Sequence, residues 1–167
     1  MSEKSYEFAV AETTGVGIGP IGLRPATPAD APFAYSVKKL ALGACIAQTW
    51  GWNEDEQVGC HRREYKPELI RIITLGGTDI GTVAVTSDGG RVLLCMLYLL
   101  PEYQRHGIGT RIVRSVQAQA QRDSLPVRLA VLKVNPAQEL YRRFGFMPVE
   151  ETATHVKMEW NPGNSVT

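Results

Sequence analysis

The sequence of 167 residues lacks the features that would assign it to a membrane, secreted or zinc-binding class. No apolar run approaches the roughly 20 residues of a membrane-spanning helix, and the first residues lack the basic start and apolar stretch of a secretory signal. Its three cysteines, Cys45, Cys60 and Cys95, form no Cys-x-x-Cys pair and show no metal-ligand spacing. These absences favour a cytoplasmic protein with reduced thiols and no bound metal.

An excess of charge of either sign is also absent, because 18 Lys and Arg residues balance 17 Asp and Glu residues. We therefore expect neither nucleic acid nor a membrane surface as a partner. The hydrophobic fraction of 44% can form a substantial core, and the length suits one domain. We expect this domain over residues 21–162, after a flexible leader at 1–20 and before a C-terminal tail at 163–167.

The most informative stretch is residues 97–110, with the sequence LYLLPEYQRHGIGT. An apolar strand runs to Pro101, the closely spaced Gly107 and Gly109 follow, and a helical pattern begins at Ile108. The start of a helix leaves main-chain N–H groups free and favours negative charge. Glycines have no Cβ, so a phosphate can approach the main chain closely. The stretch therefore predicts a binding site for an anionic phosphate group.

Two common phosphate-binding motifs do not fit. A P-loop requires Lys-Ser or Lys-Thr after the glycines, and a dinucleotide fingerprint requires an apolar strand that Gly15, Gly17 and Gly19 lack. The pattern Q/R-x-x-G-x-G/A does fit, and on it the chain resembles the Gcn5-related N-acetyltransferase (GNAT) family over residues 21–160. This resemblance implies acetyl-CoA as co-substrate, its pyrophosphate held by Gln104, Arg105, His106, Gly107, Ile108, Gly109 and Thr110.

A second segment, residues 127–146, has the sequence VRLAVLKVNPAQELYRRFGF. A buried strand leads to Asn135, which is a good helix cap before Pro136, and Gly145 ends the short helix. GNAT proteins resemble this arrangement, which implies that Asn135 contacts the pantetheine arm and that Tyr141 protonates the departing thiolate. The residues alone also allow Asn135 to be only a cap and Tyr141 only a core residue.

The order of predicted elements is β-α-α-β-β-β-α-β-α-β-β. It implies a GNAT fold, an α/β (α+β) architecture in which about four helices flank a mixed, mostly antiparallel sheet of about seven strands. We expect Cys95 to be buried as a small core residue, and Tyr6–Val10 could add a short strand. The expected helices before the phosphate-binding stretch are 31–42 and 55–65, and the expected strands are 69–75, 80–87 and 92–100.

Acyl transfer from a thioester requires positioning, polarisation of the carbonyl and a neutral amine. The resemblance implies that the main chain of the strand containing Leu97 and Leu99 polarises the thioester. Many relatives carry a glutamate on this strand as the base, but residues 92–100 contain no carboxylate. The base is therefore unassigned, and the candidates Glu56, Glu64 and Glu68 are better explained as surface residues.

The stretch TWGWNEDEQ lies between the first two predicted helices. A subset of GNAT proteins has a similar W-G-W-x-x-x-x-Q pattern, which implies that Trp52 and Gln57 line the acceptor pocket. Alternatively, Trp50 and Trp52 fill the core beneath a loop. The acidic residues at 54–56 suit a cationic amine acceptor, although they would also stabilise the start of a helix.

Two functions remain open on the sequence. The first is an N-acetyltransferase that transfers acetyl from acetyl-CoA to a primary amine, either of a small molecule or of a protein. The second is a catalytically silent GNAT module that binds acyl-CoA as a sensor or scaffold. The acceptor is not specified, and the sequence leaves open whether the chain forms a homodimer.

Overall fold

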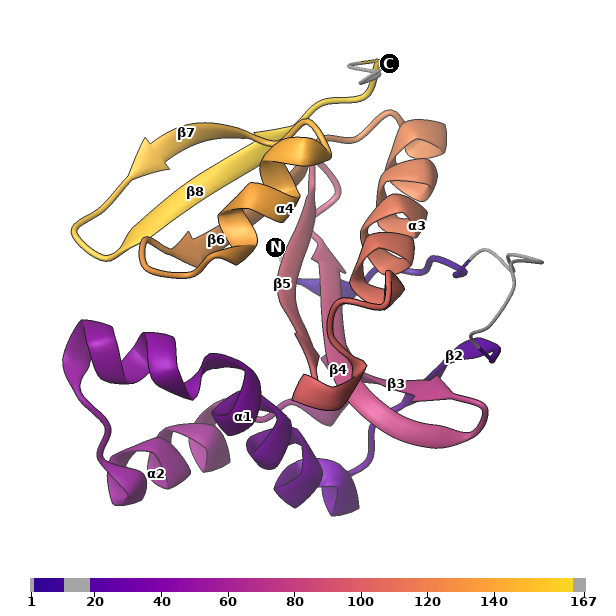
Figure 1. The fold of residues 1–167 in the computed structure, drawn as a ribbon. Coiled ribbons are helices and arrows are strands. Elements are labelled where there is room, and N and C mark those ends of the chain that lie inside the picture. Colours follow the sequence, from indigo (N-terminus) through magenta and orange to yellow (C-terminus); the bar gives the residue numbers. More distant parts are fainter. Residues whose placement is uncertain (1, 11–18, 164–167) are drawn as a thin grey trace.

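A computed structural model describes residues 2–10 and 19–163, and the elements lie as drawn in Figure 1. One sheet has the strand order β2-β3-β4-β5-β6-β8-β7, and β1 pairs with β4. Every pairing is antiparallel except that of β5 with β6, so the predicted fold class is confirmed. The elements are β1 (Lys4–Ser5), β2 (Ile21–Pro25), α1 (Ala31–Trp50), α2 (Glu54–Glu64), β3 (Arg71–Leu75), β4 (Thr78–Ser87), β5 (Val92–Leu99), α3 (Ile108–Asp123), β6 (Val127–Leu132), α4 (Ala137–Arg143), β7 (Met147–Glu151) and β8 (His155–Trp160).

The main core lies between α3 and the sheet. Ile112, Val113 and Val116 recur at helical spacing on one face of α3 and are almost completely buried. They pack in one cluster with strand residues such as Val83 and with Phe146. Burial of each such side chain contributes roughly 1.5–3 kcal/mol relative to its exposure. This packing fixes the start of α3 beside the end of β5.

The sheet opens between β5 and β6. The two strands pair only at Val92–Val127 and Leu93–Arg128, and Figure 1 shows β6 turning away from β5 beyond these pairs. The pairing of β4 with β5 shifts register so that Cys95 is an extra residue in β5. Such a bulge bends a strand and increases its twist. The bulge therefore lies where β5 leaves its parallel neighbour.

The same bulge corrects the prediction for Cys95. Its side chain is exposed, whereas Leu94 beside it is buried. The Cys95 sulfur lies 3.5 Å from the hydroxyl of Thr86. An extra residue interrupts the alternation of faces along a strand, so continuous apolar sequence did not translate into burial at this position.

The first helix is longer than predicted and continues to Trp50 instead of ending near residue 42. Gly43 lies inside the helix, and the ring of Trp52 packs beside it, 3.6 Å from where a Cβ would lie. The helix ends at Gly51, whose positive φ of 81° suits a residue without a side chain. The next helix begins after Asn53, whose side chain accepts a hydrogen bond from the main-chain N–H of Glu56 at 3.0 Å.

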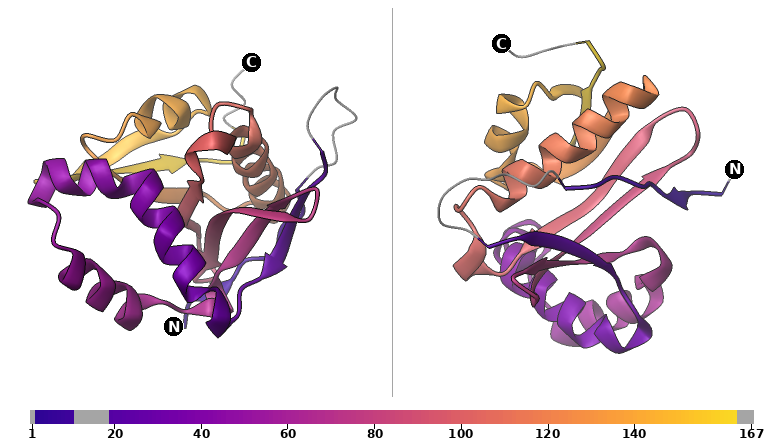
Figure 2. Two further views of the ribbon diagram at one scale, coloured as in Figure 1. Left: turned by 60° about the horizontal axis from the view of Figure 1, so that its bottom comes forward. Right: turned by 90° about the vertical axis from the view of Figure 1, so that its right-hand side faces the viewer.

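Part of the segment that we expect to be a leader packs on the domain. Its strand forms at Lys4–Ser5, ahead of the predicted Tyr6–Val10, and lies along the end of β4 (Figure 2). Phe8 is only 8% exposed and joins the main core, and Glu7 forms an ion pair with Arg71. Residues 11–18 of the expected leader and residues 164–167 of the expected tail lie outside the described residues.

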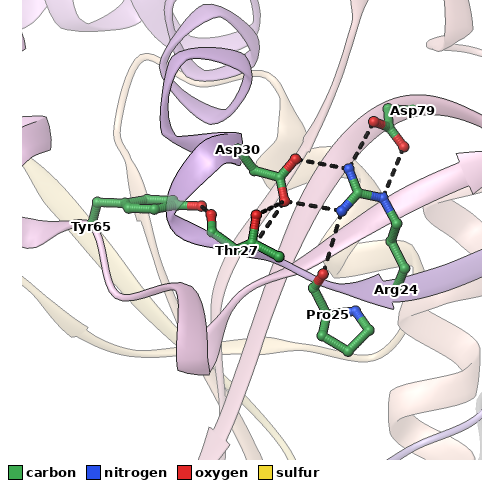
Figure 3. Close-up of polar contacts among 6 residues, drawn as sticks. All are labelled: Arg24, Pro25, Thr27, Asp30, Tyr65 and Asp79. Carbon is green, nitrogen blue, oxygen red and sulfur yellow. Dashed lines mark hydrogen bonds and ion pairs between the residues drawn. The ribbon is translucent and has the colours of Figure 1, made fainter.

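An ion cluster ties β2 to the start of α1 and to β4 (Figure 3). The guanidinium of Arg24 donates to both carboxylate oxygens of Asp30 at 2.8 and 2.9 Å, and to both of Asp79 at 2.8 and 3.1 Å. The Arg24 guanidinium holds the pKa of Asp30 well below its usual range. Asp30 also accepts from the main-chain N–H of Thr27 at 2.8 Å. The cluster therefore fixes the first turn of α1 against the sheet.

Candidate functional site

The start of α3 is built to receive an anion. Gly107 adopts a left-handed conformation with a φ of 78° and caps the helix. The first N–H bonded inside the helix belongs to Arg111, which donates to the Gly107 carbonyl at 3.1 Å. The N–H groups of Ile108, Gly109 and Thr110 have no acceptor within the described chain. Three donors without a protein acceptor and the positive end of the helix dipole therefore lie together in the first turn of α3.

The space beside the two glycines of this turn is open. A Cβ built on Gly107 or on Gly109 would meet no atom within 4 Å. Arg105 and His106 are exposed in the same loop, and Arg105 has a φ of 63°, which is rare for a residue with a side chain. A basic loop around an open glycine surface suits a charged ligand.

The loop is tied to the strand before it. The side-chain amide of Gln104 donates a hydrogen bond of 2.9 Å to the main-chain oxygen of Leu99. Leu97 and Leu99 pack their side chains against the main core. Beyond Leu93 the edge of β5 that faces β6 has no strand partner, so its main-chain groups are free to hold an extended ligand. The loop at residues 104–110, which we call the phosphate loop, thus continues directly from this edge of β5.

Asn135 lies across the opening, just after β6. Its side-chain oxygen accepts from the N–H of Ala137 at 2.9 Å, although the helix itself begins one residue later than Pro136. The side-chain NH₂ of Asn135 has no acceptor among the described residues. Gln138 fixes this corner, since its amide donates to the carbonyl of Lys133 at 2.7 Å. The predicted cap therefore keeps two donors that can meet a ligand.

Tyr141 comes from the middle of α4. Its ring packs edge-on against Phe146 with centroids 5.8 Å apart. Burial raises the pKa of Tyr141 to about 12, and the nearby Tyr98 adds to the shift. No described residue forms a hydrogen bond with the Tyr141 hydroxyl. The side chain therefore holds a neutral phenol that can donate to a ligand.

The segment between α1 and α2 lines a hollow of about 590 Å³. Trp52 and Gln57, the two predicted acceptor residues, both border it, and Trp50 beside them is 59% exposed. The indole of Trp50 also packs on His155 of β8, with ring centroids 5.9 Å apart. The hollow therefore lies beside the strand that pairs with the end of β6. Its lining residues are Trp50, Gly51, Trp52, Asn53, Glu56 and Gln57.

Glu54 has a structural role at this hollow. Its carboxylate accepts from the Trp52 indole N–H at 2.7 Å, the Tyr35 hydroxyl at 2.8 Å and the Lys39 ammonium at 3.0 Å. Hydrogen bonds from Trp52, Lys39 and Tyr35 lower the pKa of Glu54 to about 2. Glu54 therefore orients the Trp52 ring and links α1 to α2.

The three candidate bases occupy different places. Glu56 lines the hollow, and no described residue pairs with its carboxylate. Glu64 borders a small cavity of about 50 Å³ together with Met96 of β5. Glu68 is exposed in a short 3₁₀ helix and borders neither hollow.

Sequence reasoning missed Tyr98 in β5. Burial raises the pKa of Tyr98 to about 12, and a charge on Tyr98 raises the pKa of Tyr141. The alternation of side chains along a strand could have identified it. Leu97 and Leu99 face the core, so Tyr98 between them must point to the other face of the sheet.

Among the described residues, no cluster of His, Cys, Asp and Glu could hold a metal ion. The described helices likewise include none that is long and apolar enough to cross a membrane.

Residues 46–148 match the family model described as acetyltransferase (GNAT) domain. This match covers the end of α1, the phosphate loop, Asn135 and Tyr141. No curated protein sequence matches the chain significantly.

Solved structures share the fold at low sequence identity. A PaiA N-acetyltransferase from Thermoplasma acidophilum, in complex with coenzyme A, has a TM-score of 0.68 and 21% identity, covering 85% of this chain and 99% of that one. The ribosomal-protein-S18-alanine N-acetyltransferase from Escherichia coli has a TM-score of 0.62 and 16% identity, covering 87% and 96%. An acetyltransferase from Thermus thermophilus has a TM-score of 0.67 and 19% identity, covering 86% and 98%.

Proposed function

Because this chain belongs to the GNAT acetyltransferase family, we propose that it transfers the acetyl group of acetyl-CoA to a primary amine by direct attack. The observation that carries this proposal is the surface that runs from the free N–H groups at the start of α3 to the unpaired edge of β5. One end suits a diphosphate and the other an extended thioester arm.

The coenzyme would be held mainly by main-chain groups. Its pyrophosphate would lie on the loop from Gln104 to Thr110, where the missing side chains of Gly107 and Gly109 leave room. Its pantetheine arm would lie between the main chain at 97–99 and the side-chain NH₂ of Asn135. Positioning of this kind supplies most of what an activated thioester needs.

Tyr141 is the residue that we assign to the chemistry. The amine nitrogen forms a bond to the acetyl carbon, the carbon–sulfur bond breaks, and the sulfur takes the phenolic proton of Tyr141. The proton that the amine nitrogen loses passes to solvent, and solvent returns a proton to the Tyr141 oxygen. The raised pKa keeps this phenol neutral at physiological pH, so the proton is present when the sulfur leaves.

The amine would enter from the hollow lined by Trp52 and Gln57. Glu56 is the carboxylate of that lining, and no Lys or Arg lines it, so a cationic amine suits this entrance. Small-molecule and protein amines both remain candidates at this wide hollow. The solved relatives include an acetyltransferase of a ribosomal-protein alanine, which is a protein amine.

A catalytically silent module that binds acyl-CoA is the second candidate. The observation that favours it is the lack of any carboxylate in β5, where many family members place a base. Both candidates predict that the protein binds the coenzyme, and only turnover separates them.

A thiol-release assay with acetyl-CoA and a panel of amines tests the proposal. The panel should include polyamines, aromatic amines, amino acids and peptides with free N-termini or lysines. We expect release of free thiol that depends on one class of amine and that mass spectrometry matches to an acetylated product. Tight binding of the coenzyme without turnover of any amine would favour the silent module.

A further inference from the structure

The hollow between α1 and α2 is separate from the surface that we assign to the coenzyme. Its lining comes only from the segment 50–57, and none of the residues at 97–110, nor Asn135 or Tyr141, borders it. Figure 1 shows the end of α1 on the same side of β5 as β6, which is the side of the unpaired edge of β5. An acceptor that reacts at this edge and also occupies the hollow must therefore be long enough to span both.

Contacts link the hollow to the strand that borders the opening. The indole of Trp50 packs on His155, with ring centroids 5.9 Å apart, and His155 pairs with Leu132 at the end of β6. The main-chain carbonyl of Leu132 accepts a hydrogen bond of 2.9 Å from the N–H of Asn135. Two residues thus connect the wall of the hollow with Asn135, which we place beside the pantetheine arm.

The hollow presents groups that suit a positive charge. The carboxylate of Glu56 lines it and pairs with no described residue, and no described Lys or Arg lines it. The indole of Trp50 in the same lining is 59% exposed. The side-chain oxygen of Gln57 has no donor among the described residues and adds a hydrogen-bond acceptor. An exposed indole face attracts an ammonium group, and a carboxylate nearby adds to this attraction.

The protein already holds one of its own ammonium groups in this way. Lys39 places its ammonium 5.8 Å from the centroid of the Trp52 ring and 3.0 Å from the carboxylate of Glu54. Trp52 and Glu54 are thereby occupied, and the Trp52 indole N–H also donates to Glu54. Trp50 and Glu56 offer the same two chemical groups in the same segment, and among the described residues neither has a cation of its own.

The nitrogen that is acetylated is not the charge that this hollow suits. Its lone pair must attack the acetyl carbon, so this nitrogen must be neutral when the bond forms. A carboxylate beside it would favour the charged form and thereby oppose the loss of its proton. A cation site apart from the coenzyme therefore suits a second ammonium group of the acceptor, one that takes no part in the reaction.

We propose that the hollow binds a second positive charge of the acceptor, so that the substrate is a primary amine with an ammonium group at the far end of a flexible chain. This inference rests on the proposed acetyl transfer and names its substrate class. Linear diamines and polyamines have this chemistry, and so does a peptide whose free N-terminal residue is followed by a lysine. The hollow of about 590 Å³ lies within the roughly 300–1,000 Å³ of small-molecule sites.

The kinetic test compares linear diamines of increasing length with the matched monoamines, in which a methyl group replaces the second ammonium. A second arm compares a peptide that has lysine after its free N-terminal residue with the same peptide carrying norleucine there. We expect kcat/KM to be about tenfold higher for the doubly charged acceptor in one of the two arms, which identifies the source of the acceptor. Equal kcat/KM values within every pair would overturn the inference, while the turnover itself would leave the proposed function intact.

Two variants test whether the preference arises in the hollow. Glu56→Gln removes the charge and Trp50→Leu removes the aromatic ring, and each should reduce the preference for the second charge several-fold. Asp55→Asn is the matched control, because Asp55 is exposed in the same turn of α2 and does not line the hollow. An equal reduction in Asp55→Asn would show a general effect of net charge and would overturn the site. A role of Glu56 as base would slow both members of a pair alike and leave their ratio unchanged, which would also overturn it.

A binding readout requires no turnover. In protein labelled with nitrogen-15, the indole N–H groups of the three tryptophans, Trp50, Trp52 and Trp160, give separate NMR signals that single Trp variants assign. Added diamine should shift the Trp50 signal more than the matched monoamine does, whereas Trp160, which is buried in the main core, should not respond. Equal shifts by both amines would overturn the inference but not the proposed function. Absence of turnover with every amine would contradict the proposed function itself.

Discussion

Gln104 holds the end of the strand that precedes the phosphate loop: its side-chain amide donates a 2.9 Å hydrogen bond to the main-chain oxygen of Leu99. One side chain thus fixes the distance between two parts of the proposed coenzyme site. Gln104, the first residue of the Q/R-x-x-G-x-G/A pattern, therefore shapes the loop in addition to any contact that it makes with phosphate.

Gln104→Ala should weaken coenzyme binding without unfolding the protein, since Gln104 is exposed. A single neutral hydrogen bond contributes about 1 kcal/mol, so we expect the Kd for acetyl-CoA to rise about fivefold. Calorimetric titration measures this change. The matched control is Gln119→Ala, because the side chain of Gln119 bonds only the side chains of Arg122 and Asp123. Gln117 and Gln138 are less suitable controls, because each of them bonds a main-chain carbonyl. An equal loss in both variants would contradict a specific role of Gln104.

Tyr141→Phe should preserve the edge-on packing against Phe146 and remove only the proton donor. We expect coenzyme affinity to be nearly unchanged and kcat to fall about 10²–10⁴-fold, the usual contribution of a positioned acid or base. Steady-state kinetics with a turned-over amine, together with titration of coenzyme A, separate the two quantities. Wild-type turnover would leave Tyr141 as a core residue.

Glu56→Gln tests the hollow between α1 and α2. If Glu56 attracts a cationic amine, the KM for that amine should rise several-fold while the Kd for acetyl-CoA stays constant. If Glu56 were instead the base, kcat would fall and the KM would change little. Glu68→Gln is the matched control, because Glu68 does not border the hollow.

The Arg24 cluster should make stability depend on acid pH. The pKa of Asp30 is lowered in the folded state, so its contribution is present above the ordinary carboxyl range and is lost as the pH falls through and below that range. Thermal unfolding of the wild type should therefore show a falling Tm below about pH 4.

In Arg24→Leu, Asp30 and Asp79 lose their shared cation. We expect the free energy of unfolding to fall by roughly 1–3 kcal/mol at neutral pH, which lies between the values for exposed and buried ion pairs. Below about pH 4 the difference from the wild type should shrink. A constant difference across this range would show that the cluster is not the source of the pH dependence.

Much of the fold could be predicted because its signals are local. Glycines at 107 and 109 and the apolar spacing after them placed α3, and Gly145, with a φ of 86°, ends α4 as expected. The burial of Cys95 was predicted wrongly, since a bulge depends on register with β4 rather than on the apolar run itself.

The candidate site was only partly predictable for the same reason. Motif positions such as Asn135 follow directly from the sequence, and they lie at the opening between the strands. The opening itself requires β5 and β6 to diverge beyond Leu93, which no local pattern encodes. The linking of Trp52, Tyr35 and Lys39 by Glu54 likewise depends on how α1 packs beside α2.

Calorimetric titration of acetyl-CoA into the Gly109→Glu variant tests the central claim most directly. A side chain at Gly109 meets no protein atom, and a carboxylate in the first turn of a helix is favourable, so the variant should fold. Gln119→Glu, which adds the same charge near the other end of α3, is the control. The account predicts that Gly109→Glu abolishes measurable binding while Gln119→Glu binds as the wild type does. Wild-type affinity in a folded Gly109→Glu protein would contradict the assignment of this loop to the coenzyme pyrophosphate.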